Sequence, residues 1–192
     1  MGDIDLRTWI RTEHDGALAR FEQSVVAAVP RERWTDPAGT GGSSIAYLAF
    51  HTAYHEDLAI NAVLGGAQPL AATWRDDLGL GLLAPTAGLG ETEVPELTAA
   101  LDLDRLVPYV RAVHAASAAI IDAVDLGVDV APDAGPIGLT RAGVDDAAVP
   151  WLHAMWTAKP ASWFVQWEAV GHRINHLGEM VSVRNRMGLS PF

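Results

Sequence analysis

The chain has 192 residues, of which 49% are hydrophobic and 19% charged, and its formal net charge is −11. This length and composition predict one globular domain, residues 1–192, and exclude a disordered chain. With 24 acidic against 13 basic residues, the chain lacks the Lys and Arg that nucleic acids and anionic membranes recruit. We therefore expect neither nucleic acid nor a membrane among its partners.

The chain contains no cysteine, which excludes disulfides, thiolate metal ligands and a cysteine nucleophile. Residues 1–5 include two aspartates where a signal peptide needs a basic start and an apolar run. No apolar stretch approaches the roughly 20 residues that cross a bilayer. We expect a cytoplasmic protein.

The first predicted helix covers residues 5–29. Its apolar side chains recur every three or four positions, which is the spacing of one helix face. Asp3 or Asp5 is expected to cap its start, and Pro30 ends it.

A second helix is predicted from Ser44, a candidate N-cap, to Leu64, with glycine directly after it. Residues 65–101 are rich in Gly, Pro and Thr and have no sustained periodicity. This segment is expected to be a long crossover with one short helix at 74–83, because so long a connection in a compact domain is usually functional or partly ordered.

The third helix is predicted from Asp102 or Asp104 to about Val124, a stretch that carries an apolar face. Residues 127–146 read as a loop, and a short helix is expected at 151–156. The last helix is predicted from Pro160, which suits a first helical turn, to Met187. Four long amphipathic helices, two long connections and no strand pattern predict an all-α protein, a four-helix bundle with long crossovers.

Two pairs of histidines stand at i, i+4 on predicted helices: His51 with His55, and His172 with His176. This spacing stacks two imidazoles on one helix face, close enough to bind the same ion. Neutral imidazole suits divalent transition metals, and three histidines with an open position are typical of catalytic zinc. The alternative for each pair is a set of hydrogen-bonded histidines at the edge of the core.

Other metal motifs are incomplete. His55-Glu56 begins like the zinc-protease motif His-Glu-x-x-His, but Ala59 stands where the second histidine is needed. A di-iron carboxylate bundle needs paired Glu-x-x-His motifs, and the chain contains none. A site for a single metal ion remains.

The residues around these histidines resemble the DinB-like superfamily of metalloenzymes. The run 42–51, Gly-Ser-Ser-Ile-Ala-Tyr-Leu-Ala-Phe-His, looks like the start of that family's second helix. The run 171–179, Gly-His-Arg-Ile-Asn-His-Leu-Gly-Glu, followed by 183–188, resembles its last helix with the His-x-x-x-His-x-Gly signature. The order of the helices also fits, so the resemblance spans most of the chain. The long segment 65–101 departs from the family pattern and could reshape the pocket entrance.

The resemblance implies that His51, His172 and His176 bind a divalent metal ion, zinc or nickel, in a DinB-like four-helix bundle. The family is related to mycothiol- and bacillithiol-dependent S-transferases and to the metal-binding domain of mycothiol-dependent maleylpyruvate isomerase. It therefore implies a small-molecule substrate and a low-molecular-weight thiol cosubstrate for an S-transferase or a related hydrolase. The alternative is a non-catalytic metal-binding bundle with a stress or interaction role. A homodimer fits both.

Three further residues are candidates for roles around the metal. His55 is open to four interpretations: a fourth ligand, a group that hydrogen-bonds to a ligand, a base, or a histidine at the edge of the core. Glu168 lies one turn before His172, and Glu179 lies three residues after His176. Each carboxylate either accepts a hydrogen bond from a ligand imidazole or is an exposed helix residue.

The remaining histidines and the arginines of the last helix are assigned structural or surface roles. Packing is expected for His14, on the apolar stripe of the first helix, and a structural or surface position for His114 and His153. Solvated helix faces are expected for three arginines: Arg173, Arg184 and Arg186. Four tryptophans near the last helix are expected in the core or in a dimer interface: Trp151, Trp156, Trp163 and Trp167.

Overall fold

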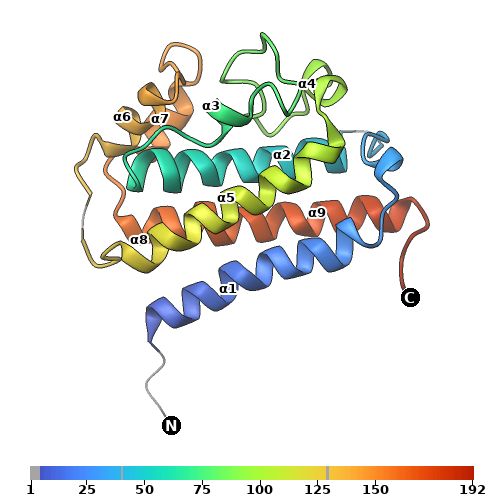
Figure 1. Ribbon diagram of the computed structural model, residues 1–192, viewed down its shortest axis with the longest axis horizontal. Helices are drawn as coiled ribbons and strands as arrows, with labels where there is room; N and C mark the ends of the chain where they lie inside the picture. The colour runs from blue at the N-terminus through green and yellow to red at the C-terminus, as the bar shows by residue number, and fades with distance from the viewer. Residues whose placement is uncertain (1–4, 40, 129) are drawn as a thin grey trace.

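In this computed structural model, residues 5–39, 41–128 and 130–192 are described, and their regular structure is helical throughout (Figure 1). The all-α class predicted from the periodicity is confirmed. The long segments are α1 (Leu6–Phe21) with π-helical η1 (Glu22–Val26), α2 (Ile45–Glu56) with π-helical η3 (Asp57–Leu64), α5 (Leu103–Ala123), and π-helical η4 (Phe164–Gly171) with α9 (His172–Arg186). The short elements are η2 (Arg31–Arg33), α3 (Ala71–Trp74), α4 (Pro95–Ala100), α6 (Ala134–Arg141), α7 (Pro150–Trp156) and α8 (Ala161–Trp163). Within the described part of the chain, no helix has both the length and the hydropathy needed to cross a bilayer.

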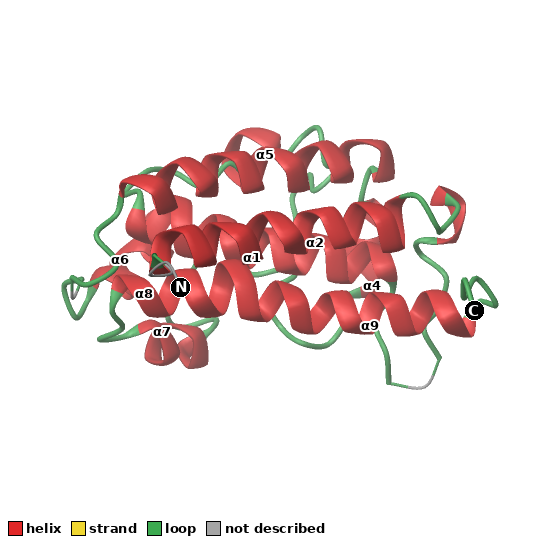
Figure 2. Ribbon diagram, turned by 90° about the horizontal axis from the view of Figure 1, so that it is seen from below, coloured by secondary structure: helices red, strands yellow, loops and turns green. Residues whose placement is uncertain are grey.

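The four long segments lie side by side, and each contacts two of the others. Helix α2 packs on α5 and α9, and α1 packs on the same two helices from the other side (Figures 1 and 2). Every residue of α2 is buried. Since a buried polar group is costly without a partner, the polar side chains of α2 must find partners on neighbouring elements.

The starts of the long helices follow from capping side chains. Asp5 accepts hydrogen bonds from two backbone N–H groups of α1, and Asp102 does the same for α5. The Ser44 hydroxyl accepts from the Tyr47 N–H at the start of α2. Asp3, the other predicted cap of the first helix, lies outside the described residues. The helix ends agree with the prediction to within a few residues, and Gly188, with φ +77°, ends α9.

The π-helical turns adjoin the two histidine pairs. Segment η3 begins one residue after Glu56, and η4 ends at Gly171, directly before His172. A π turn inserts an extra residue and rotates the side chains that follow it, and such turns are frequent at functional sites. The faces that α2 and α9 present to each other are therefore set at these junctions.

The connection 65–101 differs from its prediction. The expected short helix at 74–83 is wrong: α3 ends at Trp74, turns follow, and α4 was not predicted. Polar side chains of the second long segment hold this connection in place. The buried Asp57 carboxylate accepts from the N–H groups of Leu70 and Ala71, and the Tyr54 hydroxyl donates to the Pro85 carbonyl.

The segment 127–146 was expected to be a loop, and this is wrong because α6 lies within it. Two of its glycines, Gly135 and Gly138, are required for close packing rather than for turns. A Cβ on Gly135 would overlap Trp156 of α7, and a Cβ on Gly138 would overlap Val63 of η3. Glycine here lets two backbones approach closely, and a composition-based prediction mistakes this use for a loop.

Candidate metal centre

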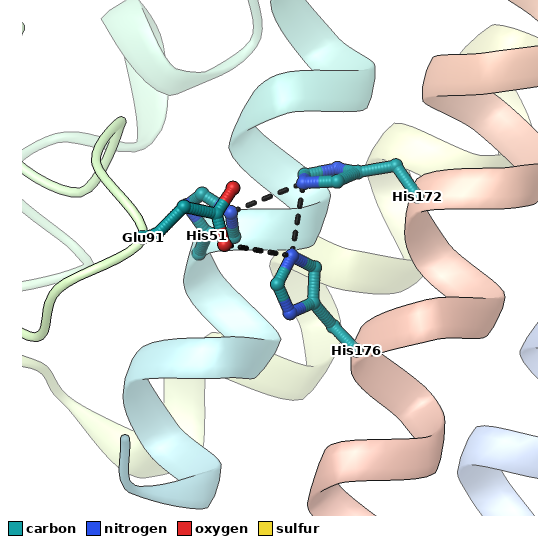
Figure 3. A group of neighbouring side chains, drawn as sticks. All are labelled: His51, Glu91, His172 and His176. Carbon is teal, nitrogen blue, oxygen red and sulfur yellow. Dashed lines mark hydrogen bonds and ion pairs between the residues drawn. The ribbon is translucent and has the colours of Figure 1, made fainter. Parts of the chain in front are cut away.

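Three histidines from two helices converge on one point. The Nε2 atom of His172 lies 3.1 Å from Nε2 of His51 and 3.0 Å from Nε2 of His176 (Figure 3). His51 projects from α2, and His172 and His176 project from successive turns of α9. All three are buried, with at most 5% of their surface exposed. We call these three residues the open histidine cluster.

The other ring nitrogen of each histidine faces an oxygen. His51 Nδ1 lies 2.7 Å from the Gly88 carbonyl oxygen, which can only accept a hydrogen bond. His176 Nδ1 lies 3.3 Å from a carboxylate oxygen of Glu179, and His172 Nδ1 lies 3.8 Å from one of Glu168. The Gly88 carbonyl places the ring hydrogen of His51 on Nδ1, which leaves Nε2 of His51 as an acceptor toward His172.

The imidazoles of His51 and His172 are neutral near pH 7. Burial, and then the charge of His55, lower the pKa of His51 to about 3. The same two causes lower the pKa of His172 further. Unprotonated Nε2 atoms in contact, as in His51 and His172, repel each other, and a cation between them removes that repulsion.

A divalent ion fits these three nitrogens. Zinc–nitrogen bonds of about 2.0–2.1 Å in tetrahedral geometry put neighbouring nitrogens roughly 3.3 Å apart. The two Nε2 separations of 3.0 and 3.1 Å are close to that value. The donor set, nitrogens backed by oxygens on the far side of each ring, is also the one that binds such ions.

His55 lies beside Glu168. Its Nε2 lies 3.0 Å from the Leu89 carbonyl oxygen, and its Nδ1 lies 3.4 Å from a Glu168 oxygen. Burial lowers the pKa of His55, but the hydrogen bond and charge of Glu168 outweigh it, so the pKa is raised. Donor atoms of His55, Glu168 and His172 also lie within 4.8 Å of one another, but Nε2 of His55 already faces the Leu89 carbonyl.

Glu168 is anchored from both sides. Its second oxygen accepts a 2.9 Å hydrogen bond from the indole N–H of Trp156. The carboxylate is buried, so its charge depends on His55 and the nearby His172 ring. The sequence left open whether Glu168 was exposed, and burial between α7 and α2 decides the question.

A cavity of about 310 Å³ adjoins the open histidine cluster. It lies between the connection that carries Glu91 and the face of α9 that carries Glu179, Ser182 and Arg186. A larger cavity of about 430 Å³ lies against the Phe50 side of α2. No histidine lines either cavity, but the smaller one is lined by Glu91 and Glu179, the two carboxylates that lie beside His176, so it is the one next to the open histidine cluster.

A second buried polar group lies on the opposite side of the same helices, and its members are His14, Glu56, His114 and Arg173. Glu56 accepts a 2.8 Å hydrogen bond from His14 Nε2, and its other oxygen lies 3.1 Å from Arg173 Nη2. Arg173 Nη1 lies 3.2 Å from His114 Nδ1. The rings of His14 and His114 stack with centroids 3.9 Å apart. We call this group the arginine-closed cluster.

Donor atoms of His14, Glu56 and His114 lie within 4.8 Å of one another, as a metal site would require. Arginine N–H groups already face them, however. Arg11 Nη1 lies 3.1 Å from His14 Nδ1, and Arg173 reaches both Glu56 and His114. An ion here would have to displace a buried guanidinium, so this cluster acts as a structural ion-pair network.

The structure brings all six predicted site residues together: His51, His55, Glu168, His172, His176 and Glu179. Packing of His14 is consistent with the prediction, and His153 makes a structural bond to the Val144 carbonyl. The solvated helix face expected for Arg173 and Arg184 is wrong. Arg173 is 3% exposed and pairs with Glu56, and Arg184 is 6% exposed and donates to the Ser24 carbonyl. Sequence reasoning also missed Glu91 and the buried role of Glu56. The signal in the sequence that could have indicated burial of Glu56 was its place in a helix that has no polar face.

Comparison with known proteins finds no match for this chain. No protein-family model, no curated protein and no solved structure matches this chain. Its function is therefore inferred from the side chains that the fold brings together.

Proposed function

We propose that this protein is a divalent-metal-dependent enzyme of the DinB-like type, a four-helix bundle that binds zinc or nickel through His51, His172 and His176. Its reaction is the transfer of a small thiol or the hydrolysis of a small substrate. The contacts of the four long segments and the position of the histidines on the second and last of them support this family.

One observation carries the proposal: the Nε2 atom of His172 lies within 3.1 Å of the Nε2 atoms of both His51 and His176, and each ring presents its Nδ1 to an oxygen. A histidine buried only for packing needs one hydrogen-bond partner and has no reason to meet two further imidazoles edge to edge. Supporting oxygens behind each ring are the arrangement found around metal-binding histidines.

The chain's own residues hold and orient the site. The Gly88 carbonyl and the carboxylates of Glu168 and Glu179 set the tautomers and the directions of the rings. The ion would act as a Lewis acid toward the oxygen or sulfur of a substrate. Arg186, at the edge of the adjoining cavity, offers a guanidinium to a substrate carboxylate.

Thiol transfer suits a chain without cysteine. The sulfur arrives with a cosubstrate thiol and forms a bond to an electrophilic carbon. The leaving group departs with its electron pair, and the thiol proton passes to solvent. The cavity of about 310 Å³ has room for small reactants beside the histidines.

A non-catalytic metal-binding bundle is the second candidate, and Glu91 favours it. The carboxylate of Glu91 reaches the open histidine cluster, with one oxygen 3.7 Å from His176 Nε2. Four protein ligands around an ion are typical of a closed structural site.

Elemental analysis of the purified protein tests the proposal. We expect about one zinc or nickel ion per chain, and its loss in His51→Ala and in His172→Ala. His153→Ala is the matched control, because it also removes a buried histidine. His153 belongs to none of the three groups of histidines and carboxylates whose donor atoms lie within 4.8 Å of one another. A native chain that stays metal-free after incubation with both ions, or full metal in His172→Ala, contradicts the site.

Turnover is tested on the metal-loaded protein with low-molecular-weight thiols and an aryl halide. The enzyme proposal expects conjugation that is lost in His172→Ala. Bound metal without turnover of any thiol or ester substrate favours the non-catalytic bundle.

A further inference from the structure

A short strap, residues 88–93, crosses the open histidine cluster and is tied to α2 by the same histidines that form the site. His51 donates to the carbonyl of Gly88, and His55 to that of Leu89, over 2.7 and 3.0 Å. The backbone of the strap is therefore fixed by hydrogen bonds from the site itself.

The other end of the strap is equally well held. The buried Tyr47 hydroxyl lies 2.7 Å from the Gly90 carbonyl and 2.9 Å from the Thr92 carbonyl. Glu93 accepts a 2.8 Å hydrogen bond from the hydroxyl of Ser44, the cap of α2. Bonds on both sides of position 91 leave its backbone little freedom.

Gly88 shows that the path of the strap is specified by the sequence. Its φ of +86° is in the left-handed region, and a Cβ there would overlap the rings and methyl groups of Phe50 and Leu97. Only glycine fits without strain, and its carbonyl is the one that orients His51.

Glu91 is the residue that the strap presents to the histidines (Figure 3). Its carboxylate has a donor oxygen within 4.8 Å of the donor nitrogens of His51, His172 and His176. Among the described residues, its only ion-pair partner within 4 Å is His176. The side chain is 74% exposed, so it contributes little to packing.

From these contacts we infer that Glu91 is a fourth, displaceable ligand that occupies the open position of the metal centre until a substrate thiolate or other anion replaces it. The inference rests on the proposed function. The strap positions the carboxylate, and the exposure of the side chain lets it leave into water by rotation about its own bonds. Glu168 is the contrast: buried between His55 and Trp156, it has no such route.

A displaceable ligand lowers the apparent affinity for any anion that binds at the same position. If Glu91 fills the position about nine-tenths of the time, its removal tightens anion binding about tenfold. It also changes the donor set of the ion, which a spectroscopic metal reports directly.

The test uses the full chain loaded with cobalt(II), whose visible absorption depends on its ligands, and thiocyanate and 2-mercaptoethanol as probes. Wild type, Glu91→Ala and Glu91→Gln are compared at equal cobalt content. Glu96→Gln, an exposed glutamate on α4, is the matched control. We expect the spectrum to change in both Glu91 variants and not in the control, and both probes to bind about tenfold more tightly to the Glu91 variants than to wild type.

Each contrary result is distinct. Unchanged spectra and probe affinities with about one cobalt per chain overturn the role of Glu91 and leave the proposed metal centre standing. Loss of cobalt from Glu91→Ala also overturns it, because the carboxylate would then be a permanent ligand. Absence of probe binding to every form overturns it too, because the metal would then offer no position to an anion even without Glu91. No cobalt in wild type overturns the proposed function and the inference with it.

Discussion

The open histidine cluster and the arginine-closed cluster share two helices, α2 and α9, where their residues stand one position apart; the arginine-closed cluster also takes His14 from α1 and His114 from α5. His172 belongs to the first and Arg173 to the second; His55 supports the first and Glu56 belongs to the second. Both clusters are buried and both combine imidazoles with carboxylates. They differ in what faces the imidazole nitrogens: other unprotonated nitrogens in the first, and guanidinium N–H groups in the second.

The comparison shows that a count of nearby histidines and carboxylates does not identify a metal site. A cluster whose acceptors already receive hydrogen bonds is satisfied without an ion, and a cluster with converging free acceptors is not. The two clusters are also neighbours. The Glu56–Arg173 ion pair joins α2 to α9 at the positions next to His55 and His172.

The largest expected effect is a loss of folding stability when the arginine-closed cluster is broken. Arg173→Ala leaves the buried Glu56 carboxylate without its ion pair, and we expect the free energy of unfolding to fall by about 3–5 kcal/mol in urea titrations. The folded variant is expected to keep its metal ion. Arg186→Ala, on the exposed face of the same helix, is the control and should change stability little. Equal stability of Arg173→Ala and wild type, or loss of metal from the folded variant, would break the comparison.

Acid is expected to act on the closed cluster through Glu56. Burial raises the pKa of Glu56, but Arg173 and His14 lower it more, to about 2 from the usual 4.5. A carboxyl whose pKa is lowered by folding stabilises the fold above its unfolded pKa, and this contribution is lost as the pH falls from 4.5 toward 2. The loss is about 3 kcal/mol.

The measurement is the free energy of unfolding as a function of pH for wild type and Glu56→Gln. The amide has the size of the carboxyl and does not titrate. Below pH 4.5, the wild type should therefore lose stability more steeply than Glu56→Gln, by the contribution of Glu56. Histidines with lowered pKa, including His114 at about 4, destabilise both proteins below pH 6.5, because the unfolded chain binds the proton first. Parallel curves for the two proteins below pH 4.5 would show that Glu56 is not held ionised by the cluster.

The next prediction concerns Glu168, the buried carboxylate beside the open histidine cluster. Glu168→Gln replaces an oxygen that faces two ring nitrogens with an amide that can turn an N–H toward them. We expect zinc affinity, measured by competition with a chelating dye, to fall about 10- to 100-fold. Glu96→Gln is the control. Zinc affinity unchanged in Glu168→Gln would mean that Glu168 stabilises the fold without orienting His172.

The smallest effect is expected at Glu179, the exposed carboxylate beside the open histidine cluster. Glu179 lies 3.3 Å from His176 Nδ1 but is 56% exposed, so water can replace it. Glu179→Gln should weaken zinc binding at most about fivefold in the same assay. A loss as large as that of Glu168→Gln would show that burial does not decide how strongly an outer carboxylate supports its histidine.

Most of the helical structure could be predicted because it depends on local patterns. Apolar spacing, the caps Asp5, Asp102 and Ser44, and the glycine after α9 all act within a few residues of the element they define. The wrong predictions concern segments stabilised from a distance. The start of α3 receives its hydrogen bonds from Asp57, and the glycines of α6 fit against Trp156 and Val63.

The candidate site divides in the same way. The i, i+4 spacing predicted two histidine pairs on helix faces, and the resemblance to the DinB-like superfamily selected His51, His172 and His176 from these four. The roles of Glu91 and Arg173 were not visible. Glu91 lies in an aperiodic segment. Its position over the histidines depends on long-range hydrogen bonds, among them those from Tyr47, His51 and His55.

The sequence by itself determined the helices, the residue types of the site and the faces on which the histidines stand, because these depend on local periodicity and capping. Only the tertiary structure decided which buried polar groups receive arginine N–H donors and which retain free nitrogens. That outcome depends on the register between α2 and α9, adjusted by the π turns at Asp57 and Gly171, and on the path of the strap. These are packing relations between residues far apart in the chain, and a shift of one residue along a helix turns a side chain by about 100°.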